Sequence, residues 1–290
     1  MRILSLPYKS LWIPLIILVM ASCSEIIDIE LDSTYRRLVV FGEVTSDSLP
    51  HQVRLSYSSD YFYNKPSPAV SGAMVELVCD NELFVLEEYD TIPGLYYAPY
   101  AFRGSIGKEY RLNISQIDVD EDGVDEVYHA QSTMPGGILL DSISLFYFSS
   151  PFATGYQVLM YAFDPPEREW YNFKLWRNRD MLADTLIKYS VQSDDFLNNS
   201  YTFGLPVGFL SDDDPREAVQ PGDTITFELN SITENYYDFI VDAQLEIMGN
   251  NPLFSGPPAN VSSNIEEGGL GVFTAYSIQR VSTIAPPLEQ

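Results

Sequence analysis

Hydrophobic and polar residues alternate along most of the chain after residue 35. Between His51 and Ser58, for example, Val53 and Leu55 alternate with Gln52 and Arg54, which is the period of a strand with one buried face. Turn residues separate such segments at intervals of roughly 8–12 residues, as in β-sandwiches. Strands are predicted over 37–44, 51–58, 70–79, 93–98, 107–114, 138–149, 156–163, 169–176, 223–229 and 271–277. The pattern therefore predicts a mainly all-β protein.

One segment has the period of a helix instead. Apolar residues recur at steps of three and four from Ile232 to Ile247, and Ser231 with Glu234 three residues later has the form of a capping box. Gly249 and Asn250 follow as helix-ending residues. The sequence thus predicts one helix near 233–248.

The chain is expected to divide into two domains. Pro135, Gly136 and Gly137 follow a predicted strand and are typical of a linker. The segment before them, 36–135, has an order of Gly-Ala and Pro-Gly-x-Tyr motifs that resembles transthyretin/Ig-like β-sandwiches of bacterial surface proteins. The segment after them, 136–290, is predicted to be a second β-rich domain that contains the helix.

The N-terminus is typical of a lipoprotein signal peptide. Two basic residues precede an apolar run of 11 residues, 11–21, which is too short to cross about 30 Å of hydrocarbon at 1.5 Å per residue. The run ends at Met20-Ala21-Ser22-Cys23, which resembles the bacterial lipobox. We expect residues 1–22 to be removed and Cys23 to be lipidated, with 23–35 as anchor and acidic linker. The alternative is an ordinary signal peptide in which Cys23 is incidental.

An acidic stretch, Ser24 to Glu30, follows this cysteine. It resembles the export signal that directs Bacteroidota lipoproteins to the cell surface. We therefore expect the protein to be held in the outer membrane by its lipid anchor and exposed at the cell surface, with a periplasm-facing lipoprotein as the alternative.

The charge and the cysteine count exclude several classes of function. The formal net charge is −25, and because the predicted leader contributes Arg2 and Lys9 but no acid, the rest of the chain carries −27. Because so acidic a chain repels phosphate backbones, nucleic acid is not an expected partner. Two cysteines and two histidines are too few for a disulfide framework or a four-cysteine zinc site.

One acidic segment has the composition of a calcium loop. Carboxylates at alternate positions followed by Gly123 offer hard oxygen ligands and a residue that permits a sharp turn. An EF-hand is excluded because position 12 of the loop is His129. The alternative is a polar hairpin tip. The candidate calcium ligands are Asp118, Asp120, Asp122, Asp125 and Glu126.

Two further patterns suggest modification or binding. Asp-Ser and Asp-Thr pairs followed by an aliphatic residue resemble the O-glycosylation sequon of exported Bacteroidota proteins, with Ser48 and Thr91 as the first candidates because they fall in predicted loops. The same pairs also begin ordinary turns. Trp170 and Trp176 fall on the polar face of a predicted strand, where they could stack on a glycan or a peptide, although packing in the interior is the commoner use of such residues.

The chain as a whole resembles domain-of-unknown-function family 4249, outer-membrane lipoproteins of Bacteroidota. The resemblance covers nearly all of the mature sequence, and its most specific part is Ser263-Asn264-Ile265 followed by Gly268-Gly269-Leu270-Gly271-x-Phe273. It implies association with a TonB-dependent transporter barrel, and it supplies no catalytic residues. Ser263 and Asn264 are accordingly weak candidates for partner binding.

The sequence therefore favours a non-catalytic lipoprotein that accompanies such a transporter or captures its substrate. The helix and the loop 251–267 are the predicted partner-facing surface, because long loops in compact domains are usually functional. A structural or adhesive surface lipoprotein is the alternative. A glycan-active enzyme is a distant third, since serine-hydrolase, zinc-protease and phosphate-loop motifs do not occur. Calcium is the one cofactor suggested.

Overall fold

The computed structural model describes residues 36–59, 66–80, 82–195, 199–248 and 261–287. Residues 36–290 group into one compact unit, separate from 1–35. The signal peptide, Cys23 and residues 251–260 of the predicted partner loop lie outside the described residues. In the described part no helix is long and apolar enough to span a membrane.

The all-β prediction is confirmed: strands make up most of the described chain, with one α-helix among these residues, α2 (Glu234–Met248). A short 3-10 helix, η2 (Leu186–Lys188), precedes β14. The strands are β1 (Leu38–Thr45), β2 (Ser48–Leu49), β3 (Gln52–Tyr57), β4 (Met74–Cys79), β5 (Glu82–Glu88), β6 (Leu95–Tyr97), β7 (Phe102–Arg103), β8 (Glu109–Ile117), β9 (Glu126–Thr133), β10 (Leu139–Ser149), β11 (Thr154–Phe163), β12 (Trp170–Arg177), β13 (Asp180–Met181), β14 (Ser190–Ser193), β15 (Tyr201–Ser211), β16 (Thr224–Ile232) and β17 (Leu270–Ile284).

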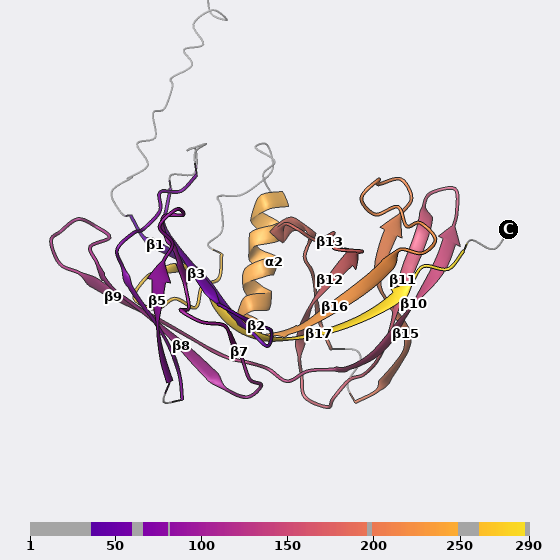
Figure 1. The fold of residues 1–290 in the computed structure, drawn as a ribbon, viewed down its shortest axis with the longest axis horizontal. Helices are drawn as coiled ribbons and strands as arrows, with labels where there is room; N and C mark the ends of the chain where they lie inside the picture. The colour runs from indigo at the N-terminus through magenta and orange to yellow at the C-terminus, as the bar shows by residue number, and fades with distance from the viewer. Residues whose placement is uncertain (1–35, 60–65, 81, 196–198, 249–260, 288–290) are drawn as a thin grey trace, which may run out of the picture. The chain divides into compact units, whose positions relative to one another are not determined.

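Twelve of these strands form one sheet in the order β13-β12-β16-β17-β1-β3-β6-β5-β4-β8-β9, with β14 pairing with β12. β10, β11 and β15 form a separate three-stranded sheet, and β2 pairs with β7. Figure 1 shows the last strand, β17, running from the neighbourhood of β1 to that of β10 and β11.

The two halves of β17 have different partners. Leu270 to Tyr276 pair in parallel with Val39 to Thr45 of β1, and Ser277 to Ile284 pair antiparallel with β16. A parallel pair needs a long connection, and here nearly the whole chain supplies it. β17 therefore joins the strands of the N-terminal half to those of the C-terminal half.

The first hydrophobic core lies on one face of the N-terminal strands. Val40 of β1, Val53 and Leu55 of β3, and Phe273 of β17 are almost completely buried in it. Because side chains alternate across a strand, the residues between them point to the opposite face. The period-2 pattern that predicted these strands thus also determines which residues are buried.

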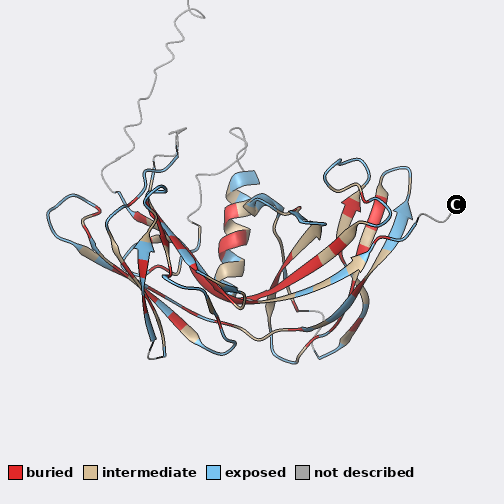
Figure 2. Cartoon of the chain, in the orientation of Figure 1, coloured by how far each residue is buried: buried red, intermediate tan, exposed pale blue. Residues whose placement is uncertain are grey.

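The second core lies between the three-stranded sheet and the C-terminal part of the large sheet. Tyr171 and Phe173 of β12, Phe227 of β16 and Val158 of β11 pack together there. Figure 2 shows the buried residues along β16 and β11. In this half of the chain two sheets therefore face each other across the second core.

Helix α2 covers the other face of the large sheet. Its residues Phe239 and Ile240 are buried in a third, smaller cluster with Tyr276 and Val272 of β17. The predicted helix is confirmed, but its predicted cap is wrong. Thr233 accepts the N–H of Tyr236 through its side-chain oxygen at 3.4 Å, whereas Ser231 belongs to β16 and is buried.

The predicted linker is packed against β17. Gly136 O accepts the hydroxyl of Ser277 at 2.7 Å, and Met134 and Ile138 on either side are completely buried in the first and second cores. The chain between the two halves is thus held by side chains of the strand that joins them.

Several strands differ from their predicted extents. β17 continues to Ile284, past the predicted end at 277, and β4 begins only at Met74. β15 was missed because Gly204, Pro206 and Gly208 interrupt its pattern, and its pairing with β11 shifts register at two places. Such irregular strands lack the clean alternation on which the prediction depended.

Two carboxyl groups in the second half share one phenol. The Tyr171 hydroxyl lies 3.0 Å from Asp164 Oδ1 and 2.6 Å from Glu169 Oε2. A phenol has one proton to donate, so the second contact is a hydrogen bond only if one carboxyl is protonated. Burial raises the pKa of both Asp164 and Glu169, and the charge of nearby Asp194 adds to the effect. The geometry therefore favours a neutral carboxylic acid in this pair.

Gly271 is required where β17 meets β1. Its φ is +95°, and a Cβ at this position would lie 2.1 Å from the carbonyl oxygen of Val40. We predict that Gly271→Ala lowers the free energy of unfolding by about 3 kcal/mol, because strain and collision add. Gly268→Ala is the control, since its φ is also positive (+81°) but its Cβ would meet nothing within 4 Å, so about 1 kcal/mol is expected. Urea unfolding checks both, and equal losses would contradict the collision.

His51 is buried and neutral. Its Nδ1 accepts the N–H of Thr45 at 3.4 Å and its Nε2–H donates to the carbonyl of Phe102 at 3.1 Å. Burial lowers the pKa of His51 to about 4 from an ordinary value of 6.5. The unfolded chain therefore binds a proton that the folded chain does not.

We predict that the stability contributed by neutral His51 is present above pH 6.5 and is lost as the pH falls toward 4, by on the order of 3 kcal/mol. An NMR titration of the His51 ring checks the pKa directly, and urea unfolding across the same range checks the stability. A ring that titrates near 6.5 in the folded protein contradicts the assignment.

Candidate functional site

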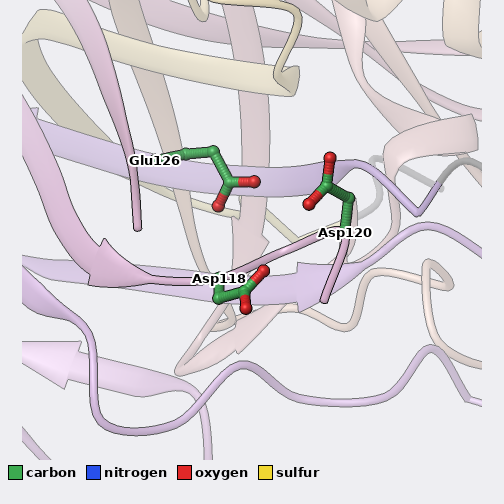
Figure 3. Close-up of side chains that lie close together, drawn as sticks. All are labelled: Asp118, Asp120 and Glu126. Atoms are coloured by element: carbon green, nitrogen blue, oxygen red, sulfur yellow. The ribbon is translucent and has the colours of Figure 1, made fainter. Parts of the chain in front are cut away.

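The predicted calcium segment forms the loop between β8 and β9. Asp118, Asp120 and Glu126 each place one carboxylate oxygen within 4.8 Å of the others. Figure 3 shows these three side chains close together. Asp118 and Glu126 are half-buried and Asp120 is exposed. Of the five predicted ligands, these three come together, whereas Asp122 and Asp125 are not part of the group.

The loop also uses these oxygens for its own backbone. Asp118 accepts the N–H groups of Asp122 and Gly123 at 3.1 and 2.8 Å, and Glu126 accepts that of Val119 at 2.7 Å. Such bonds are what a polar turn needs, so the calcium and turn interpretations both fit. The geometry leaves three converging carboxylates, which suits a hard cation that takes further oxygens from water.

We predict that millimolar calcium raises the melting temperature of the wild type and that Asp120→Ala abolishes the gain. Asp125→Ala is the matched control, because this residue lies in the same loop but outside the converging group. Differential scanning calorimetry with and without a chelator checks this. If calcium leaves the melting temperature of the wild type unchanged, the loop is a polar turn and not a calcium site.

A second candidate site is a cleft of about 360 Å³ between the large sheet and helix α2. Strands β1, β3, β6 and β17 form its floor, and α2 and η2 form its wall. Ligand pockets of small molecules begin at about this size. Its lining residues are Phe41, Gly42, Glu43, Gln52, Arg54, Leu95, Leu186, Tyr189, Tyr236, Phe239, Val272 and Thr274.

The register of the strands determines which polar side chains face the cleft. Glu43 pairs with Gln52, and Phe41 pairs with Arg54, so that all four side chains share the face opposite the first core. Thr274 lies directly beside Glu43 on β17, and its Oγ1 is buried and has no hydrogen-bond partner among the described residues.

Aromatic side chains form the rest of the cleft. Phe41 and Phe239 meet edge to face with ring centroids 5.6 Å apart, and Tyr236 stacks between Phe239 and Tyr276. Glu43 accepts the hydroxyl of Tyr276 at 2.8 Å. Burial, and then the charge of Glu43, raises the pKa of Tyr276 and of Tyr236, so this carboxylate lies among neutral phenols.

The two predicted aromatic binding residues lie on the α2 side of the sheet. Trp170 is half-buried against the third cluster, and the guanidinium of Arg168 lies over its ring at 5.1 Å. Trp176 is half-buried, and its buried indole N–H has no hydrogen-bond partner in the part of the chain that the structure describes. Neither residue lines the cleft.

Ser263 and Asn264 bond within the chain. Asn264 donates to the carbonyl of Phe273 at 2.7 Å and accepts its N–H at 3.0 Å, as a neighbouring strand would. Ser263 donates to Gly269 O at 3.3 Å, and Ile265 is buried in the first core. The most specific motif of the sequence thus fastens the start of β17 to the first core.

The predicted glycosylation residues are both exposed. Thr91 lies in the turn between β5 and β6, as expected. Ser48 was expected in a loop, but it lies in the short strand β2, which pairs with β7. Cys79, at the end of β4, is a free thiol.

Sequence reasoning missed the cleft. Its residues come from positions 41–54, 95, 186–189, 236–239 and 272–274, and nothing in the sequence indicates that these segments meet. The one signal was Arg54, a basic residue on the polar face of a predicted strand in a strongly acidic chain.

The comparison with known families settles the membership of the chain. The family described as domain of unknown function DUF4249 matches residues 24–282. The chain therefore belongs to this family, as the sequence resemblance indicated. A search of curated proteins finds no match.

Proposed function

We propose that this protein is a lipid-anchored, non-catalytic binding protein of the outer membrane that captures a small ligand beside a TonB-dependent transporter. The observation that carries the proposal is the cleft under α2. It combines an apolar, aromatic wall with the charged side chains of Glu43 and Arg54, and this is the usual make-up of a ligand site.

The lipobox-like sequence at Cys23 supports the proposed anchor. A protein held in the plane of the membrane has a raised effective concentration near any barrel in the same membrane, so a weak contact suffices to keep the two together. Membership of family DUF4249 is consistent with this proposal, although the family has no assigned activity.

The exposed end of α2 is the proposed contact with the barrel. Leu245, Ile247 and Met248 are each more than half exposed, although they are large and apolar. Helix α2 also forms one wall of the cleft, through Tyr236 and Phe239. Helix α2 thus carries cleft residues near its start and the proposed contact with the barrel near its end.

Gentle detergent extraction of the native lipoprotein, followed by mass spectrometry of the co-purifying proteins, tests the proposal. We predict that a transporter barrel is recovered in stoichiometric amount with the wild type and is lost with Cys23→Ala, which removes the anchor. Recovery of the correctly localised wild type alone would contradict the proposal and favour the adhesive alternative. A Leu245→Asp/Ile247→Asp variant keeps the anchor. Loss of the barrel with this variant would indicate contact through α2, and its recovery would indicate co-localisation alone.

A further inference from the structure

We propose that the cleft under α2 binds a small zwitterionic ligand, of the class of short peptides, with its carboxylate at Arg54 and its ammonium at Glu43. This rests on the proposed role in ligand capture and names the class of ligand.

Arg54 is the feature that selects a carboxylate. The chain has 41 acidic against 16 basic residues, so a basic side chain readily finds an acidic partner. Nine of the basic residues in the described part do form ion pairs. Arg37, Arg54, Arg103 and Arg179 form none among the described residues, and of these four it is Arg54 that lines the cleft, together with Glu43. A planar guanidinium left open in an aromatic cleft suits a carboxylate, which it can bind through two parallel hydrogen bonds.

Glu43 and its surroundings select a cation. Its carboxylate is tied by one oxygen to the Tyr276 hydroxyl, which fixes its position. Its charge also acts on Tyr189 and Tyr236, which line the same cleft. A carboxylate beside aromatic side chains attracts an ammonium group through both the ion pair and the ring faces.

The strand register places the two charged residues close together. Glu43 lies opposite Gln52 and Arg54 lies two residues further along β3, so the two charged residues are diagonal neighbours on one face. Such neighbours are about 7–8 Å apart at the backbone, so one small ligand with opposite charges at its two ends can reach both side chains.

Apolar side chains of the ligand have surfaces to pack on. Phe41 is 45% exposed on the floor, and Phe239 and Tyr236 face it from the helix. A neutral sugar would pack on the rings but would leave both charges unused.

Isothermal titration of the full-length mature lipoprotein in detergent tests this assignment. The probes are the dipeptides Ala-Phe and Phe-Ala, the N-acetylated forms, which lack the ammonium, and the C-terminal amides, which lack the carboxylate. We expect the free dipeptides to bind, and each blocked form to bind at least about tenfold more weakly, because each leaves one charged partner unpaired.

Two variants then assign the two ends. Arg54→Gln should weaken binding of the free dipeptides about tenfold and cause no further loss for the amides. Glu43→Gln should weaken binding of the free dipeptides about tenfold and cause no further loss for the N-acetylated forms. The amide oxygen of the introduced glutamine can still accept the Tyr276 hydroxyl. Arg103→Gln, an exposed arginine outside the cleft, is the control and should bind as the wild type does.

Three results would overturn the inference: no binding of the free dipeptides at millimolar concentration, equal binding of free and blocked forms, or tighter binding of a neutral disaccharide that neither variant weakens. None of these affects the co-purification with a barrel, so failure of the ligand class is distinguishable from failure of the proposed function. Melting temperatures of the variants equal to that of the wild type show that any loss of binding is local.

Discussion

The whole structure depends on the pairing of one strand with two partners. β17 completes the first core by pairing in parallel with β1 and the second by pairing antiparallel with β16. The close approach of the two backbones at Gly271 and the peptide-like bonds from Asn264 to Phe273 fix its register at the start. Because a slip of one residue would exchange the two faces of the strand, this register determines what is buried on both sides of the sheet. Neither half of the large sheet is complete before the C-terminal strand is in place.

The candidate cleft is a consequence of this pairing. Its floor consists of residues on β1, β3 and β17 whose neighbours along each strand are in the first core, and α2 packs over the same face. β17 thus supplies Phe273 to the core and Thr274 to the cleft from consecutive positions. The site is built on strands rather than on loops, so its geometry is tied to the stability of the core.

Charge is distributed unevenly in this acidic protein. Where carboxylates are buried in the sheet they are paired: Glu228 is 2% exposed and binds Arg280 at 2.7 Å, and Arg280 also binds Asp47 at 2.8 Å. Around Tyr171, where Asp164 and Glu169 have no cationic partner among the described residues, burial raises the pKa of both carboxyl groups. Arg54 forms no ion pair among the described residues and lines the cleft, so its guanidinium is suited to a ligand there.

The sequence by itself determined the fold class, the helix and most strands, because period-2 and period-3.6 patterns follow from local geometry. It also placed three converging carboxylates in one loop, since Asp118, Asp120 and Glu126 are close along the chain. Only the tertiary structure decided that β17 extends to Ile284 and pairs with both β1 and β16, that Thr233 caps α2, and that Glu43, Arg54, Thr274 and Tyr236 share a cleft. These features depend on contacts between residues far apart in the chain. A pattern read along one segment states which face is buried, but not which segment covers it.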